Sequence, residues 1–236
     1  MSENRTTDEV REQNIRDMGQ ELGVIFTIIH NEVAWLSLKW GQYRLLYATS
    51  EKRIEFLNNT AGAFFAMLQT LIFEDIVLGL TRLIDPIQTG KGKNAKTNLT
   101  LHQLPCLVSD LKLRIELARL AEAAETSCEK MIDWRNKHLA HRDLALALSM
   151  DKDLLPDISR ADIEAALACF GGLLNWVSSV FQNGSMTNYR MTTPAPGDAA
   201  SLITHLQFGI KAEQVKRDRL MAGKSLPEDF IQDERI

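Results

Sequence analysis

Apolar residues recur every three or four positions along most of the chain, the spacing that places them on one face of an α-helix. Residues 8–47 contain no proline and are predicted to form one long helix, bent near Gly23 or Gly41. A second helix is predicted from an N-cap at Ser50 to about Asp85, because the proline that follows disfavours helical geometry there. The alternation typical of β-strands is essentially absent.

The second predicted helix carries an apolar stripe with this spacing, made of Leu57, Ala61, Phe64, Leu68, Leu71 and Leu78. We expect the stripe to face the core, and the apolar run at residues 61–73 to be a buried helix, because Glu74 and Asp75 end it before it reaches membrane-spanning length. The charged residues Asp75, Arg82 and Asp85 continue the stripe. Charges on a core stripe are unusual unless they are paired.

Further helical regions are predicted after a loop at residues 87–98. Thr100 and Gln103 have the spacing of a capping box and precede the first of these regions. The next helix is expected from about Ala123 to Arg142. Both regions are predicted to pack into the same helical core.

A strongly periodic helix begins at Ser159, where an aspartate follows three residues later, and ends near residue 181. A linker with prolines and a glycine leads to a last amphipathic helix at about residues 198–221. The sequence therefore predicts an all-α protein. We expect an antiparallel up-and-down bundle of four to five main helices at residues 1–183, and a linker, C-terminal helix and polar tail at residues 184–236.

Composition narrows the class of protein further. Glycine (13) and proline (6) are too scarce among the 236 residues for a many-stranded β protein. The formal net charge of −4 excludes a global field that collects nucleic acid, so any RNA contact has to be local. Cys106, Cys128 and Cys169 form no C-x-x-C pair, which favours a reducing compartment. The polar N-terminus has no apolar signal region, so we expect a cytoplasmic protein without a membrane segment.

Residues 134–143 concentrate the side chains with catalytic potential: His138 and His141, two of the five histidines, lie beside Arg135 and Arg142. On an ideal α-helix the two histidines share one face, whereas Arg135 and His141 are about 120° and about 9 Å apart. A second copy of the same helix across a two-fold axis could close this gap. A composite site at a homodimer interface is therefore geometrically reasonable.

Arg135, Asn136 and His141 resemble the signature of the HEPN superfamily (higher eukaryotes and prokaryotes nucleotide-binding). In that signature an arginine and a polar residue, often asparagine, precede a histidine, and here five residues separate Arg135 from His141. The context resembles the HEPN branch linked to bacterial abortive-infection systems against phage, over roughly residues 25–143. The features that match are the aromatic first helix, Leu80–Asp85, Leu99–Leu101 and Ala140–Asp143.

The resemblance implies a dimer with the motif at its interface and, in many members, metal-independent cleavage of RNA. His141 would then act as acid or base toward the RNA 2′-hydroxyl or the leaving 5′ oxygen, and Arg135 would stabilise the phosphorane. Asn136 would orient the histidine or a phosphate. Supporting roles fall to Arg82, Asp85, His138, Arg142 and Asp143. Neither a metal nor a cofactor is required for this chemistry.

A noncatalytic HEPN-like module that binds RNA, a nucleotide or a protein partner is the alternative. Cations late in a helix are favoured by its dipole, and Asp133 with Lys137 is an ordinary i,i+4 pair, so the motif can be purely structural. His138 and His141 could also chelate zinc with Asp143, but no further ligand lies nearby in sequence. Capping or core roles are expected for the isolated His30, His102 and His205.

Two points about the charged residues stay open at this level. Arg82 can pair with Asp85 within the second helix, or it can point toward the His141 site as a phosphate binder. HEPN toxins that a partner nucleotidyltransferase silences carry a tyrosine two residues after the motif histidine, where this chain has Asp143. That mode of neutralisation is therefore in doubt, and the partner or antitoxin protein is unidentified.

Overall fold

The computed structural model describes residues 6–92, 95–140, 157–182, 186–189 and 197–230. These residues are almost all helical, so the all-α prediction is confirmed. The helices are α1 (Thr7–Met18), α2 (Gln20–Tyr47), α3 (Glu51–Arg82), α4 (Gln103–Cys106), α5 (Leu111–Thr126), α6 (Glu129–Trp134), a π-helix (Arg135–Ala140), α8 (Arg160–Phe181), α9 (Ala199–Met221) and a 3-10 turn (Pro227–Phe230). Two short antiparallel strands, β1 (Gln88–Thr89) and β2 (Lys96–Thr97), pair within the predicted loop.

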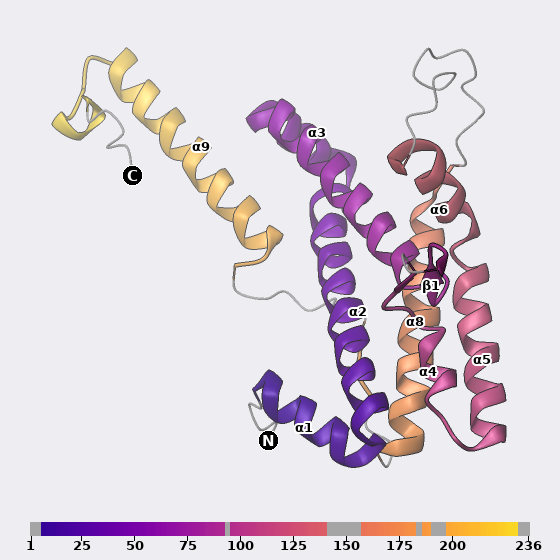
Figure 1. Ribbon diagram of the computed structural model, residues 1–236. Coiled ribbons are helices and arrows are strands. Elements are labelled where there is room, and N and C mark those ends of the chain that lie inside the picture. The colour runs from indigo at the N-terminus through magenta and orange to yellow at the C-terminus, as the bar shows by residue number, and fades with distance from the viewer. Residues whose placement is uncertain (1–5, 93–94, 141–156, 183–185, 190–196, 231–236) are drawn as a thin grey trace. The chain divides into compact units, whose positions relative to one another are not determined.

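The chain divides into two compact units. The larger unit comprises Met1–Tyr43 and Met67–Met191, and the smaller comprises Arg44–Ala66 and Thr192–Ile236. Within the larger unit, α2, the second half of α3, α5 and α8 run alternately up and down (Figure 1). The predicted antiparallel bundle is thus confirmed, while the predicted domain boundary at residue 183 stays a prediction.

The core of the larger unit is aliphatic and aromatic, and all of these helices contribute to it. Helix α5 packs along α8. The largest fully buried side chains include Phe26, Ile29, Ile76, Leu80, Leu117, Met131, Ile163, Phe170 and Leu173.

The expected single helix at residues 8–47 is wrong, because the chain turns at Gly19 between α1 and α2. Gly19 has φ +86°, a backbone conformation that favours glycine. Four residues later, α1 packs so closely on α2 that a Cβ at Gly23 would lie 2.6 Å from the carbonyl oxygen of Asn14. The buried Asn14 amide donates to Thr27 Oγ1 at 2.8 Å, which satisfies it inside this contact. A bend at Gly23 was predicted, but its role is close packing.

The two predicted capping boxes have opposite outcomes. Ser159 caps α8 as predicted: its side chain accepts from the backbone of Asp162, whose carboxylate accepts from the backbone of Ser159. Thr100 forms no capping box. Its buried hydroxyl instead donates to the carbonyl oxygen of Leu83 at 2.9 Å, which ties this segment to the end of α3.

The apolar stripe predicted on the second helix is buried only in part: Leu57 is 1% exposed, as expected, but the middle of the stripe faces outward. Phe64, Met67 and Leu71 are 51%, 54% and 53% exposed, whereas the buried face of α3 carries residues such as Ile76 and Leu80. The contact with α2 explains this choice, because a Cβ at Gly79 would lie 2.5 Å from Leu36 Cδ2. The glycine allows that face of α3, not the stripe, to approach α2. Hereafter the exposed stripe of α3 means Phe64, Met67 and Leu71.

Two helices, α3 and α8, are long and apolar enough to span a membrane by length and composition alone. Half of the most apolar window of α8 is buried inside the protein, but only 22% of that of α3. Helix α3 also bends at Ala61, where φ is −155° and ψ is 62°. The apolar surface of α3 is therefore the part of this fold that still requires an explanation.

Candidate active site

The helix predicted from about Ala123 to Arg142 is not continuous. Helix α5 ends at Thr126, α6 occupies Glu129–Trp134, and the motif segment Arg135–Ala140 is a π-helix. A π-helix has i→i+5 hydrogen bonds, so the α-helical angles expected for the motif do not apply there. Such turns are rare and frequently occur at functional sites. The backbone conformation of residues 135–140 therefore indicates a functional site independently of the side chains in this segment.

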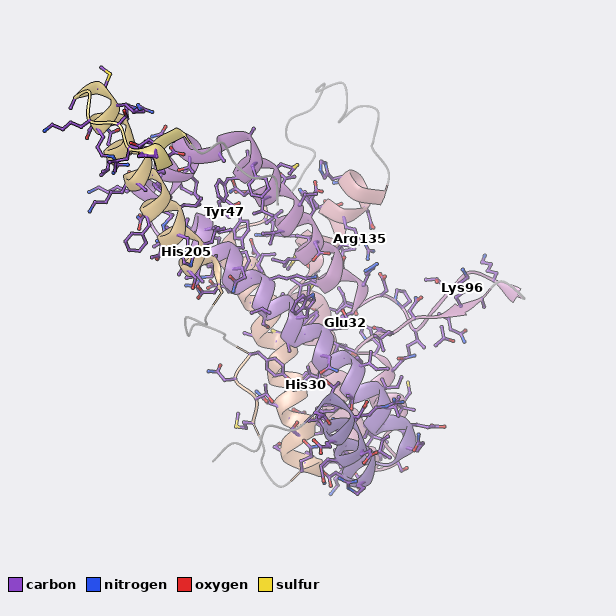
Figure 2. The ribbon with its side chains drawn as sticks, turned by 90° about the vertical axis from the view of Figure 1, so that its left-hand side faces the viewer. His30, Glu32, Tyr47, Lys96, Arg135 and His205 are labelled. Atoms are coloured by element: carbon purple, nitrogen blue, oxygen red, sulfur yellow. The ribbon has the colours of Figure 1, made fainter. Side chains whose placement is uncertain are left out.

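Arg135, labelled in Figure 2, begins the π-helix. Two side chains hold its guanidinium. Nη1 donates to Asp85 Oδ1 at 2.8 Å, and Nε donates to Asn136 Oδ1 at 3.2 Å. The Arg135 side chain is 17% exposed and that of Asp85 is 29% exposed. Among the described residues, no partner contacts Nη2, so this part of the guanidinium can donate to an anion.

Asp85 and Arg82 have different surroundings. Asp85 pairs with Arg135 across the fold, which was neither of the arrangements considered for the charged end of α3. Arg82 is exposed and forms no ion pair within the described ranges. Asp85 thus supports the motif arginine by direct contact, while a role for Arg82 toward His141 stays a prediction.

His138, within the motif segment, contacts a carboxylate of α3. Its Nε2 lies 3.3 Å from Glu74 Oε1, and its ring centroid lies 4.5 Å from that of Trp134. Trp134 in turn meets Phe73 of α3 edge to face at 5.8 Å. The sequence prediction missed Glu74, which served only to end an apolar run. The available signal was a carboxylate within an otherwise apolar helix, a position that usually requires a partner.

The predicted residues His141, Arg142 and Asp143 lie outside the described residues. The zinc alternative needed two of them, His141 and Asp143, so it is untested. Within the described ranges, no group of three or more His, Cys, Asp or Glu side chains could hold a metal ion. The predicted pair of Lys137 with Asp133 is confirmed, with Nζ and Oδ2 at 2.8 Å.

The histidines outside the motif have separate surroundings. His30 contacts Thr187 Oγ1 at 3.3 Å and the ring of Tyr189 at 5.4 Å, and burial lowers the pKa of its imidazole. His102 Nε2 lies 3.2 Å from Glu125 Oε2. His205 is exposed on α9. Capping or core roles were predicted for all three: His30 is only partly buried, and the exposed His205 has neither role in the described structure.

A comparison with known families decides the relationship that these contacts leave open. The HEPN_AbiU2 model, described as AbiU2, matches residues 19–202. This is more than three quarters of the 236 residues. The chain belongs to the HEPN_AbiU2 family. No curated protein and no solved structure gives a significant match.

HEPN_AbiU2 is an abortive-infection-associated family of the HEPN superfamily, so the resemblance inferred from the motif is confirmed at the level of the family. The matched span contains α2 through α8, including the π-helix with Arg135 and both carboxylates that hold it. Most of α9 lies beyond the match. The site is therefore built from the part of the chain that the family shares.

Proposed function

We propose that this HEPN_AbiU2 protein is a metal-independent endoribonuclease of a phage-defence (abortive-infection) or stress-response system. It acts in the cytoplasm as a homodimer. His141 is the acid or base toward the 2′-hydroxyl and the leaving 5′ oxygen, Arg135 stabilises the phosphorane, and Asn136 assists.

The observation that carries this proposal is the way in which Arg135 is held. Asp85 and Asn136 occupy Nη1 and Nε, and no partner among the described residues contacts Nη2 of this guanidinium, which is 17% exposed. A guanidinium fixed in advance binds phosphate oxygens without a further ordering cost. The π-helical backbone and the abortive-infection family support the same assignment.

The exposed stripe of α3 supports the proposed homodimer. Three large apolar side chains, each about half exposed, form one face of that helix. On an ideal helix Glu74 lies about 20° from Met67 and about 60° from Leu71. A second copy packed on the stripe would therefore lie beside Glu74, which contacts His138 of the motif segment, as a composite site requires.

The alternative is a noncatalytic HEPN module that binds RNA, a nucleotide or a protein partner. The ion pair of Arg135 with Asp85 favours this noncatalytic function, because the pair gives the arginine a structural role that requires no catalysis. The two functions differ in one measurable respect, because only the nuclease changes the covalent structure of RNA.

The deciding experiment is an RNA-cleavage assay in the presence of EDTA. The wild type is expected to leave a 2′,3′-cyclic phosphate, and RNA with a 2′-deoxy sugar at the scissile position is expected to resist. His141→Ala and Arg135→Ala should each lower the rate about a hundredfold or more. Arg119→Ala is the matched control, since this exposed arginine pairs with Glu116 on α5 and should cleave at the wild-type rate.

Cleavage that needs an added divalent metal, or that survives His141→Ala, would refute the mechanism. Binding of RNA without cleavage by the wild type would favour the noncatalytic module.

A further inference from the structure

Two carboxylates from one stretch of chain hold the π-helix. Asp85, three residues beyond the end of α3, accepts from Arg135 at 2.8 Å, and Glu74, inside α3, lies 3.3 Å from His138. The carboxylates are eleven residues apart in sequence, but Arg135 and His138 are only three apart. The two contacts therefore hold the motif segment at its first and its fourth residue.

Each of the two side chains has its own carboxylate partner. From Glu74 to the end of α3 at Arg82, eight residues rise about 12 Å, and Asp85 lies three residues further along the chain. The contact of His138 with Glu74 is therefore separate from the contact of Arg135 with Asp85.

The contact between His138 and Glu74 is partly shielded from water. The two side chains are 33% and 27% exposed, and the Trp134 ring covers the imidazole at a centroid distance of 4.5 Å. The contact of Trp134 with Phe73 fixes that ring against α3 in turn. Glu74 therefore meets a side chain whose orientation is already restricted, which reduces the entropic cost of the bond.

We propose that Glu74 is a positioning residue. It acts through His138 to hold residues 135–140 in the π-helical conformation that presents Arg135 and Asn136, and this role rests on the proposed nuclease function. The physical reason is that π-helices rarely persist beyond a single turn, so contacts outside the helix have to hold this one. Asp85 holds the start of the turn, and Glu74 holds its fourth residue.

The first test measures amide hydrogen exchange in the full-length protein. Glu74→Gln is expected to raise exchange in residues 135–140 about tenfold, because the neutral amide holds His138 less strongly than a carboxylate. Glu125→Gln is the matched control, because Glu125 contacts His102 at 3.2 Å in the same kind of pair, and no hydrogen bond or ion pair joins either residue to residues 135–140 in the described structure. The control should leave exchange at residues 135–140 unchanged.

The second test measures RNA cleavage with the same variants. Glu74→Gln should lower kcat about tenfold and leave KM within about twofold, with a melting temperature within a few degrees of the wild type. His138→Gln should have the same effect. The double variant should be no slower than either single variant, because both substitutions remove one contact.

The outcomes separate the two proposals. Unchanged exchange at residues 135–140 in Glu74→Gln would refute the positioning role whether or not the protein cleaves RNA. Additive losses in the double variant would refute action through His138. A wild type that cleaves no RNA while Glu74→Gln loosens the turn would refute the nuclease, and with it the catalytic part of this inference, but not the contact itself.

Discussion

Helices α3 and α8 have a similarly apolar composition but differ in how much of each helix the protein buries. Both are apolar enough over eighteen residues to pass for membrane spans, yet 50% of that window is buried in α8 and 22% in α3. In α8 the periodic positions Ile163, Phe170 and Val177 are fully buried. In α3 the predicted core stripe is divided, with Leu57 buried but Phe64 and Leu71 about half exposed. Periodicity thus finds an apolar face but does not say what covers it.

The difference comes from how many faces of each helix are apolar. Helix α8 has one such face, so burial in the bundle accounts for it. Helix α3 has a buried face around Ile76 and Leu80 and a second, exposed one along its stripe. Contiguous exposed apolar patches mark interaction sites, whereas apolar residues that are exposed singly are common and need no explanation. We therefore interpret α3 as a helix with one partner inside the chain and another outside it.

The largest expected effect contrasts one phenylalanine from each helix. Phe170→Ala in α8 should cost about 3 to 5 kcal/mol of unfolding free energy, because its fully buried ring would leave a cavity. Phe64→Ala in α3 should cost less than about 0.5 kcal/mol in the monomer, because half of the ring is already in water. Urea denaturation at low protein concentration measures both. Equal losses would mean that the stripe of α3 is covered within one chain.

The next effect concerns association. Met67→Glu with Leu71→Glu should raise the dimer dissociation constant about a hundredfold or more, because the new carboxylates would be buried without partners. Leu111→Glu with Ile115→Glu is the matched control, since these α5 side chains are 58% and 62% exposed at the same i,i+4 spacing. Light scattering at micromolar concentration should show a monomer for the first pair and a dimer for the control.

A monomeric wild type at that concentration would remove the composite site. Flotation of the wild type with lipid vesicles, abolished by the α3 pair alone, would assign the stripe to a membrane instead.

Much of the fold was predictable because its signals are local. The N-cap at Ser159, the end of α2 at Tyr47 and the all-α class depend on residues within a few positions of each other. The wrong predictions depend on contacts between distant segments. Gly19 turns the chain because α1 packs on α2 at Gly23, and Thr100 was mistaken for a cap because its partner, Leu83, is seventeen residues away.

The residues of the candidate site also divide into those that local spacing predicts and those that only contacts between distant segments reveal. Arg135, Asn136 and His141 were found from their mutual spacing, which a single sequence contains. The partners of the motif, Asp85 and Glu74, are fifty and sixty-four residues away from the residues that they contact. Asp85 was selected because it continued the spacing of an apolar stripe, whereas Glu74, a carboxylate that interrupts an apolar run, was interpreted only as the end of that run. The π-helical backbone could not be predicted either, since tertiary contacts hold it.

A smaller effect is expected at the serines that precede the same two helices, Ser159 before α8 and Ser50 before α3. Ser159→Ala should cost about 1 kcal/mol, because it removes the side chain that caps α8. Ser50→Ala should cost only a few tenths, since Ser50 accepts one bond, from the Arg53 backbone at 3.2 Å, on an exposed turn. Thermal denaturation at neutral pH measures both. A larger loss for Ser50 would show that α3 depends on its cap more than its exposure implies.

The cap of α8 also predicts a pH dependence. Bonds from the Ser159 side chain and backbone, and then from Lys130, lower the pKa of Asp162 below its ordinary value of 3.8. A carboxyl with a lowered pKa stabilises the fold above that ordinary value and loses its contribution as the pH falls through the folded pKa. Asp162→Asn should therefore flatten the acid end of the stability curve below about pH 4. An unchanged acid limb would contradict this assignment.

The smallest expected change in stability occurs at the exposed end of α3. Arg82 continues the helical spacing of the stripe and forms no ion pair among the described residues, so Arg82→Ala should change the unfolding free energy by less than about 0.5 kcal/mol. If Arg82 supports the site, the same variant should lower RNA cleavage or binding by about tenfold or more, because a phosphate would lose a charged donor. Arg160→Ala, at the exposed first residue of α8, is the matched control and should alter neither quantity. A loss of stability with full activity would assign Arg82 to the fold, and would leave the stripe of α3 as an apolar surface without a functional cation at its end.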